Sequence, residues 1–463
     1  MEPIAIVLAA GMGTRMKSAT PKVLHKVAGK PLVCWTVDLA RTLGARKTVV
    51  VLGHKLELVQ AALDARYGAG QIAVAKQEQQ RGTGDAVRSA LPALAGEPDD
   101  ARVLILSGDV PLTTAPTLKA LLDVQGAAPL ALIGMRPADP KGYGRLVREG
   151  GKLVRIVEEK DASADERKIN EVNAGIYAVT LGFLRQTIEL LSPQNAQGEL
   201  YLTDLIVQAA KRGAVPTIDV AVDDVAGIND RVELARLDGI ARGRIVERWQ
   251  RAGVTVLDPA SVFIEADVEL AEDVQLGPGV HLRGKTKIGR GTTIDAGCIL
   301  DNVQVAEDVE MKAYCLMTDT VVGPKGKHGP FVHCRPATVL GESTHLGNFV
   351  ETKKASLGKG SKAGHLAYLG DAEIGTGVNV GAGTITCNYD GAKKHLTVLE
   401  DGVFIGSDSQ LVAPVRVGKG AYVAAGTTVT EDVPADSLAI ARVPQVTKVG
   451  WVEKRRANQP AKK

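Results

Sequence analysis

The chain has 463 residues, of which 45% are hydrophobic but only 3% aromatic, and it contains 51 glycines. This length predicts two or three compact domains, and the composition predicts aliphatic cores with many tight turns, which excludes a simple helical bundle. The net charge of +3 and the lack of an apolar run near twenty residues give no reason to expect nucleic acid or a membrane as a partner.

Residues 1–229 are expected to form an α/β domain of the Rossmann-like type with a mostly parallel sheet. Short aliphatic runs alternate with amphipathic segments, which is the pattern of crossover units. The runs start at Ile4, Thr48, Ile72, Arg102, Pro129 and Ala174. Ligands bind beyond the carboxyl ends of the strands in such sheets, so site residues are expected directly after these runs.

The first aliphatic run leads into a glycine-rich loop, Gly11–Met16, and Lys22 follows after a proline. Glycines let the backbone approach a phosphate closely, while amides at the start of the next helix and the cations Arg15 and Lys22 offset its charge. The loop is not a dinucleotide fingerprint, because Met16 stands at the third glycine position, and it lacks the Gly-Lys-Ser/Thr ending of ATPase loops. A simple glycine-rich turn is the alternative, and the two cations favour a phosphate loop.

Asp109 follows the run that starts at Arg102, which places a carboxylate at the ligand edge of the sheet. A carboxylate there could hold Mg²⁺ against a triphosphate. The alternative is a turn or a helix cap after the strand, and the neighbouring phosphate loop favours the metal site.

Residues 8–32, LAAGMGTRMKSATPKVLHKVAGKPL, resemble the signature of the nucleotide-sugar pyrophosphorylases. The resemblance implies in-line attack of a sugar-1-phosphate oxygen on the α-phosphate of UTP, with pyrophosphate leaving and Lys22 and Arg15 as catalytic cations. It also implies that Asn229, in the string GIND, shares the metal with Asp109. The implied nucleotide contacts are Leu8, Ala9, Ala10, Gly11, Lys22, Gln77, Gly82 and Thr83, the last two at the uracil. The implied sugar contacts are Gly144, Glu158, Asn173 and Asn229.

Residues 230–252 lack proline and predict a helical linker, and residues 253–463 then repeat an aliphatic residue every six positions. Each hexad supplies a strand and a turn, three hexads close a triangular coil, and stacked coils bury the column in a parallel β-helix. The column contains Ile264, Leu270, Leu276, Leu282, Ile288, Ile294 and Leu300, then Cys334, Leu340, Leu346 and Thr352, then Leu357, Ala363 and Leu369, and finally Ile405, Leu411, Val417, Val423 and Val429. The repeat resembles the left-handed β-helix of hexapeptide acyltransferases, and the resemblance alone implies the handedness. At 311–331 the period is lost, so an irregular coil is expected there.

The second candidate site lies within this repeat. Arg335 and Lys353 are 18 residues apart and should stack one coil apart, at about 4.8 Å, as should Ser407 and Ala425. Stacked cations favour a phosphate pocket, and a solvated basic face is the alternative. His365 precedes a break in the period between Thr386 and Glu400, where a loop leaves the coil. Imidazole titrates near working pH, so His365 is a candidate base for deprotonating an amine, with a structural histidine as the alternative.

With both halves in this order, the chain resembles over essentially its full length the bacterial family that combines N-acetylglucosamine-1-phosphate uridyltransferase with glucosamine-1-phosphate acetyltransferase. The resemblance implies synthesis of UDP-N-acetylglucosamine, a precursor of peptidoglycan and lipopolysaccharide, from UTP, acetyl-CoA and glucosamine-1-phosphate through N-acetylglucosamine-1-phosphate. It implies a homotrimer with shared acetyl-transfer sites and His365 as general base. The implied contacts of the second sugar phosphate are Arg335, Lys353, Tyr368 and Asn379, and those of acetyl-CoA are Ala382, Asn388, Tyr389, Ser407, Ala425 and Arg442.

Two other functions stay open at the level of sequence. One is a different pyrophosphorylase, such as a guanylyl or thymidylyl transferase, whose β-helix only regulates or oligomerises. The other is a non-enzymatic sensor of sugar nucleotides with degenerate sites. Intact Asp109, Lys22 and His365 argue against the sensor.

The cysteines and the basic end of the chain carry three smaller expectations. Five cysteines without a Cys-x-x-Cys pair predict a cytoplasmic protein without disulfides. Cys315, His328, His333 and Cys334 superficially resemble metal ligands, but they lack the paired spacing of a zinc site. The basic residues 453–463 are expected to form a disordered tail.

Overall fold

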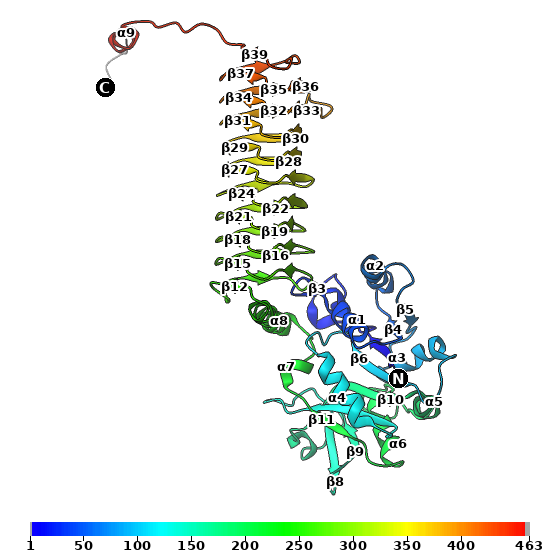
Figure 1. Cartoon of the computed structure of the whole chain (residues 1–463). Helices are drawn as coiled ribbons and strands as arrows, with labels where there is room; N and C mark the ends of the chain where they lie inside the picture. The colour runs from blue at the N-terminus through cyan, green and yellow to red at the C-terminus, as the bar shows by residue number, and fades with distance from the viewer. Residues whose placement is uncertain (1, 459–463) are drawn as a thin grey trace. The chain divides into compact units, whose positions relative to one another are not determined.

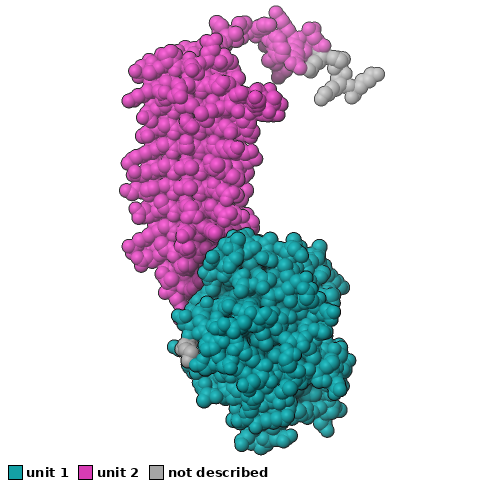
Figure 2. All heavy atoms as spheres, turned by 90° about the vertical axis from the view of Figure 1, so that its right-hand side faces the viewer, with its two compact units in different colours: residues 1–244 teal, residues 245–463 magenta. Residues whose placement is uncertain are grey.

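A computed structural model describes residues 2–458 of the chain, and it divides the chain into two compact units, Met1–Arg244 and Ile245–Lys463 (Figure 2). Helix α8 (Arg231–Arg251) contains the boundary and forms the expected helical arm. Residues 459–463, the end of the expected basic tail, lie outside the described residues. Residues 453–457 of that tail belong to helix α9 (Trp451–Ala457), so the expectation of disorder was wrong there.

Unit 1 is built on a mostly parallel sheet with the strand order β11-β7-β10-β6-β1-β4-β5, as the aliphatic runs predict. Strand β1 pairs in parallel with β4 and β6, whereas β10 runs antiparallel between β6 and β7. The strands of this sheet are β1 (Ile4–Leu8), β4 (Lys47–Leu52), β5 (Ala73–Lys76), β6 (Arg102–Ser107), β7 (Leu130–Met135), β8 (Arg145–Glu149), β9 (Lys152–Val157), β10 (Val172–Thr180) and β11 (Thr217–Asp219), and β2 (Lys26–Val27) and β3 (Lys30–Pro31) form a separate two-stranded sheet. The Rossmann-like fold class is therefore confirmed.

Helices cover both faces of this sheet. Successive side chains of β1 point to opposite faces, so Ile4 and Ile6 pack into one apolar cluster with α3, α5 and α6, while Ala5 and Val7 pack into clusters with α1, α2 and α4. The helices are α1 (Leu32–Thr42), α2 (Leu56–Tyr67), α3 (Thr83–Ala90), α4 (Ala115–Gln125), α5 (Leu181–Thr187), α6 (Leu205–Ala210) and α7 (Val222–Val225). Burial on both faces explains why the strands are continuously apolar.

Two local features of unit 1 differ from the sequence-based expectations. Strands β8 and β9 form an antiparallel hairpin that no aliphatic run predicted, because charged residues interrupt both strands. The glycine-rich loop was expected to open a helix, but it enters the 3₁₀ turns η1 (Thr14–Met16) and η2 (Lys22–Leu24), and the first α-helix begins only at Leu32. An anion bound at this edge would therefore be contacted by loop amides and side chains, and not by the first turn of an α-helix.

Unit 2 is a left-handed parallel β-helix whose short strands stack coil upon coil (Figure 1). Strands 17 or 18 residues apart pair in parallel, as the hexad period requires. The strands are β12 (Thr255–Val256), β13 (Phe263–Ile264), β14 (Glu269–Leu270), β15 (Gln275–Leu276), β16 (His281–Arg283), β17 (Lys287–Ile288), β18 (Thr293–Ile294), β19 (Ile299–Asp301), β20 (Gln304–Val305), β21 (Glu310–Met311), β22 (Leu316–Thr318), β23 (Thr320–Val322), β24 (Lys327–His328), β25 (His333–Cys334), β26 (Thr338–Leu340), β27 (His345–Asn348), β28 (Glu351–Leu357), β29 (Lys362–His365), β30 (Tyr368–Ile374), β31 (Asn379–Val380), β32 (Ile385–Cys387), β33 (Thr397–Leu399), β34 (Phe404–Ile405), β35 (Gln410–Val412), β36 (Val415–Val417), β37 (Tyr422–Val423), β38 (Thr428–Val429) and β39 (Leu438–Ala439).

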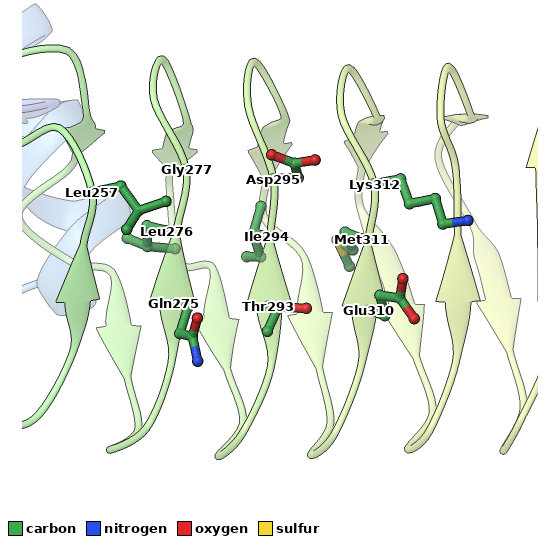
Figure 3. Close-up of a pocket in the computed structure, with 10 residues that line it drawn as sticks. All are labelled: Leu257, Gln275, Leu276, Gly277, Thr293, Ile294, Asp295, Glu310, Met311 and Lys312. Carbon is green, nitrogen blue, oxygen red and sulfur yellow. The ribbon is translucent and has the colours of Figure 1, made fainter.

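The aliphatic column predicted from the period is buried along unit 2. Figure 3 shows one face of the first coils, where Leu276, Ile294 and Met311 follow one another on β15, β18 and β21. Each of these three side chains is fully or almost fully buried. The hexapeptide fold class is thus confirmed by the burial of the repeating residue.

The expectation of an irregular coil at 311–331 was wrong. The buried column continues there through Met317, Val322 and His328, and β21 pairs with β24 as in any other coil. The step from Met317 to Val322 is five residues instead of six, because the corner at Asp319 is one residue shorter. Asp319 adopts a left-handed φ of 43°, which an aspartate tolerates better than most residues.

No helix among residues 2–458 is long and apolar enough to cross a membrane. All five cysteines are free.

Candidate active sites

A cavity of about 350 Å³ opens at the carboxyl ends of β1 and β6 in unit 1. Every nucleotide contact implied by the sequence lines it, namely Leu8, Ala9, Ala10, Gly11, Lys22, Gln77, Gly82 and Thr83. Asp109 lines the same cavity. The other lining residues are Met12 of the predicted phosphate loop, Ser107, and four that sequence reasoning missed, namely Val23, Gln80, Ala86 and Glu199.

The glycine-rich loop offers free backbone donors to this cavity. The N–H groups of residues 10–13 have no acceptor within the described part of the chain. Gly13 has a φ of 61°, and a Cβ on it would lie 2.5 Å from the Cβ of Lys22. Glycine is thus required both by the backbone conformation and by the close passage of the lysine. A run of free amides of this kind suits an anion.

Two cations and two oxygen donors meet at one side of the cavity. The ammonium of Lys22 forms an ion pair with Asp109 and donates a hydrogen bond to Asn229 Oδ1 at 3.1 Å. Arg15 donates to the same Oδ1 at 2.9 Å. Ser107 Oγ donates to Asp109 Oδ1 at 2.8 Å, which orients the carboxylate. The structure therefore brings together five residues that lie up to 214 positions apart in the sequence.

The implied sugar contacts Gly144, Glu158 and Asn173 form a second group in unit 1. A Cβ on Gly144 would lie 3.3 Å from Glu158 Oε2, and the Asn173 N–H donates to the Gly144 carbonyl at 2.9 Å. Thr203, which the sequence did not suggest, donates its hydroxyl to Glu158 Oε1 at 3.0 Å. Burial raises the pKa of Glu158 in spite of this hydrogen bond. Neighbouring carboxylates, among them Glu199 of the cavity, add to that rise.

In unit 2, the candidate base lies in one line along the β-helix with four of the six implied acetyl-CoA contacts. His365 ends β29 and is exposed, with Asn348 in register one coil before it. One coil later, β31 pairs with β29, and the N–H of Gly383, which follows Ala382, donates to the carbonyl of Leu366, which follows His365. Ala382 then precedes Ser407 and Ala425, because the Asp408 N–H donates to the Ala382 carbonyl and the Gly426 N–H donates to the Ser407 carbonyl. Arg442 donates to the Ala425 carbonyl at 2.9 Å, which extends the line.

A group of positive charges lies on the adjoining face. The Arg335 N–H donates to the Thr352 carbonyl at 2.8 Å, so Lys353 follows in the next coil. Contact with Lys394, together with the charges of Lys394 and Arg335, lowers the pKa of Lys353. Glu351 partly offsets these charges through a 2.9 Å ion pair with Arg335. Lys394 was missed because it lies in the loop that interrupts the repeat.

The interrupting loop, residues 388–396, is anchored at its base and braced at its tip. Asn388 Nδ2 donates to Asp371 Oδ2 at 2.5 Å, and Lys394 lies 3.9 Å from the same oxygen. At the tip, Asp390 pairs with His395 at 2.6 Å, and the hydroxyl of Tyr389 donates to the Gly391 carbonyl. This bracing holds a lysine against the coil face that carries Lys353.

The implied sugar-phosphate contacts of unit 2 come from two different sheets of the β-helix. Tyr368 is in register with Glu351, in the strand that carries Lys353. Asn379 instead pairs with Lys362, in the other sheet of the β-helix. The predicted pocket residues are therefore distributed over both sheets of the β-helix.

The supposed metal ligands of unit 2 are dispersed. His328 and Cys334 are buried in the inward column, while the neighbouring His333 faces outward. Among residues 2–458, no three histidine, cysteine or acidic side chains are placed to hold a metal ion.

Comparison with known proteins finds two family models on the chain. Residues 5–149 match the MobA-like NTP transferase domain, and residues 396–431 match the bacterial transferase hexapeptide, six repeats. The curated protein "Bifunctional protein GlmU" of Sorangium cellulosum is 48% identical over 460 residues, covering 98% of this chain and 96% of its own length. The protein of the same name in Trichlorobacter lovleyi is 49% identical over 459 residues, covering 98% and 99%. A third, in Anaeromyxobacter, is 50% identical over 454 residues, covering 98% and 93%.

Proposed function

Because this chain belongs to the family of the bifunctional protein GlmU, we propose that it makes UDP-N-acetylglucosamine in two steps. Unit 2 transfers the acetyl group of acetyl-CoA to glucosamine-1-phosphate. Unit 1 transfers UMP from UTP to the resulting N-acetylglucosamine-1-phosphate and releases pyrophosphate. The chain is thus both a glucosamine-1-phosphate N-acetyltransferase and a UDP-N-acetylglucosamine diphosphorylase.

The acetyl transfer needs a base and an anion site. His365 takes a proton from the sugar amine as its nitrogen attacks the thioester carbonyl, the C–S bond breaks, and the proton passes to the departing CoA sulfur. The position of His365 in line with Ala382, Ser407 and Ala425 supports this role. Arg335, Lys353 and Lys394 bind the sugar phosphate, and the lowered pKa of Lys353 supports an anion between these cations. Tyr368 and Asn379 contact the same sugar phosphate, whereas Asn388, Tyr389 and Arg442 contact acetyl-CoA.

The uridyl transfer needs no general base, because the attacking sugar phosphate oxygen is already an anion. The attacking oxygen forms a bond to the α-phosphorus of UTP, and the bond between that phosphorus and pyrophosphate breaks. Lys22, Arg15 and the free amides of residues 10–13 offset the charge on the transferring group. Support comes from the cavity that Lys22 and residues 10–12 line, and from the Asn229 oxygen that Arg15 shares with Lys22. Gln77, Gly82 and Thr83 bind the uracil, while Gly144, Glu158 and Asn173 bind the sugar.

The oxygen donors of unit 1 fit Mg²⁺. The carboxylate of Asp109 and the amide oxygen of Asn229 are hard ligands, and a single cation, the Lys22 ammonium, contacts both. Asp109 and Asn229 would hold the ion, which when bound would offset negative charge on the triphosphate. Lys22 would then be free to contact phosphate in place of these oxygens.

A homotrimer with acetyl-transfer sites shared between subunits is the assembly that we propose. Support comes from a corner next to His365, where Tyr314, Phe331, Phe349 and Leu366 are all exposed by 44–62%. The rings stack with centroids 5.4 and 5.3 Å apart. An exposed apolar column of this kind favours coverage by another subunit. A cytoplasmic location agrees with the substrates, which are intracellular metabolites, and with the free cysteines.

The observation that supports the proposal most is that one chain contains two candidate sites. Unit 1 has a cavity whose lining suits phosphate, and unit 2 has a histidine in line with implied contacts of acetyl-CoA. The test supplies purified protein with glucosamine-1-phosphate, acetyl-CoA, UTP and Mg²⁺ and then omits one component at a time. His365→Ala should stop CoA release and spare pyrophosphate release from UTP and N-acetylglucosamine-1-phosphate. Asp109→Ala should do the reverse.

Three outcomes contradict parts of this proposal. Loss of both reactions in either folded variant means that the sites are not independent. Turnover with GTP or dTTP in preference to UTP identifies a different pyrophosphorylase. No turnover in any combination leaves only a sensor with degenerate sites.

A further inference from the structure

The side-chain amide of Gln77 is held in one orientation. Its Nε2 donates to the Gly82 carbonyl at 3.1 Å and to Asp85 Oδ2 at 3.0 Å. A carbonyl and a carboxylate can only accept, so the NH₂ end must face them and the Oε1 end must face away. Gln77 Oε1 accepts no hydrogen bond within residues 2–458, and it is not fully buried. It is therefore open to the cavity that Gln77 lines.

Asp85 is in turn pinned by two arginines. Its Oδ1 accepts from Arg81 at 3.0 Å and from Arg88 at 2.6 Å, which leaves Oδ2 to Gln77. The side chain of Asp85 is only 5% exposed, whereas that of Arg81 is 54% exposed. Although burial by itself raises the pKa of Asp85, the hydrogen bonds from Gln77, Arg81 and Arg88 hold it below its ordinary value. The carboxyl therefore stays ionised and remains a pure acceptor.

The cavity thus presents an acceptor close to a donor. The acceptor is Gln77 Oε1, and the donor is the N–H of Gly82, which has no acceptor within the described residues. Gly82 cannot be replaced without disturbing this edge, because a Cβ there would lie 2.6 Å from the Leu200 carbonyl oxygen. Uracil offers N3–H beside a carbonyl and matches this pair. Cytosine offers an unprotonated N3 beside an amino group and opposes both members.

We propose that Asp85 is a positioning residue that makes unit 1 select UTP over CTP, by fixing the Gln77 amide with its oxygen toward the base. This proposal rests on the proposed uridyl transfer. Asp85 itself does not touch the nucleotide. Its influence reaches the base only through the orientation of Gln77.

The test is the ratio of kcat/KM for UTP to that for CTP in the full-length protein, with N-acetylglucosamine-1-phosphate as acceptor and pyrophosphate release as readout. In Asp85→Asn, the single oxygen of the asparagine amide accepts from the two arginines, so its NH₂ group faces Gln77. The Gln77 amide then no longer prefers one orientation. The ratio should fall about tenfold or more, because CTP then meets a donor at N3. Because an inactive fraction of protein cancels in the ratio, partial misfolding does not imitate this result.

Arg81→Gln is the matched control, since it removes one exposed partner but keeps the carboxylate acceptor. Its ratio should stay within about twofold of wild type. Asp85→Glu, which restores an acceptor, should recover most of the selectivity. If Asp85→Asn does not fold, Asp85→Ser provides the same measurement with a smaller side chain.

Failure of the inference and failure of the proposed function look different. If wild type does not release pyrophosphate from UTP, the uridyl transfer itself is wrong. If wild type prefers UTP and the Asp85 variants lose activity equally with UTP and CTP, Asp85 is merely structural and the inference is overturned.

Discussion

Lys394 joins the group of positive charges around Lys353 from outside the hexapeptide repeat. It lies in the loop 388–396, yet it contacts Lys353 and lies 3.9 Å from Asp371. Two ammonium groups in contact repel each other, and a sugar phosphate between them would relieve that repulsion. The neighbouring Lys393 contacts Asp390 through its backbone N–H and lacks the contact with Lys353.

We expect Lys394→Ala to raise the KM for glucosamine-1-phosphate about tenfold with a smaller change in kcat, because a charge-assisted contact to phosphate is lost in ground state and transition state alike. Steady-state CoA release at varied sugar phosphate measures this split. Lys393→Ala is the control and should leave KM within about twofold. If KM for glucosamine-1-phosphate rises equally in both variants, the loop acts only through its overall charge.

At the scale of elements, the inward column of the β-helix tolerates polar residues only when they find partners. Thr352 pairs with the hydroxyl of Thr338 at 3.0 Å, and Thr386 exchanges hydrogen bonds with the backbone of Gly370. Among the described residues of unit 2, His328 and Thr397 are exceptions, since both ring nitrogens of His328 and the hydroxyl of Thr397 are buried without a hydrogen-bond partner. Burial, with a smaller contribution from His345, lowers the pKa of His328 to about 3.

We expect His328→Met to stabilise unit 2, because methionine fills the position without burying unpartnered nitrogens. In wild type the folded pKa lies below the unfolded value, so the unfolded chain gains a proton first and stability is lost as pH falls below about 6.5. The advantage of the variant should therefore grow from about 1–3 kcal/mol at pH 7 to several kcal/mol at pH 5. Urea unfolding of both proteins at both pH values measures the difference in their free energies of unfolding. If that difference does not change with pH, His328 has a partner in the folded protein that lets it take up a proton.

At the scale of the whole molecule, the two candidate sites share no residue. The uridyl cavity is lined entirely from unit 1, and the line from His365 to Arg442 lies entirely within unit 2. Each unit also has its own buried core. The intermediate N-acetylglucosamine-1-phosphate must then leave one site before it enters the other.

We therefore expect two inactive variants to complement each other. A mixture of His365→Ala and Asp109→Ala proteins, each unable to complete the pathway, should convert glucosamine-1-phosphate, acetyl-CoA and UTP to the sugar nucleotide. The product should appear after a lag that shortens as protein concentration rises, because the intermediate accumulates in solution first. Chromatography of the nucleotides over time measures this, and a mixture as inactive as either variant would indicate transfer without release.

Much of the fold follows from the sequence because its causes are local or periodic. Alternation of aliphatic runs with amphipathic segments is enough to predict a doubly covered sheet, and a residue buried every six positions is enough to predict stacked coils. The charged hairpin β8–β9 and the shortened corner at Asp319 escaped prediction, because pairing with neighbouring strands overrides the local pattern in both.

The sequence by itself determined which residue types stand at the ends of strands and along the coils, including Lys22, Asp109, Arg335 and His365. Their roles in catalysis stay predictions until the variants are measured. Only the tertiary structure decided which other distant groups meet: Thr203 beside Glu158, Lys394 beside Lys353, and Asp85 beside Gln77. The physical reason is that backbone preferences and periodic burial act over a few residues, whereas the orientation of a buried polar group depends on donors and acceptors that packing brings from elsewhere in the chain.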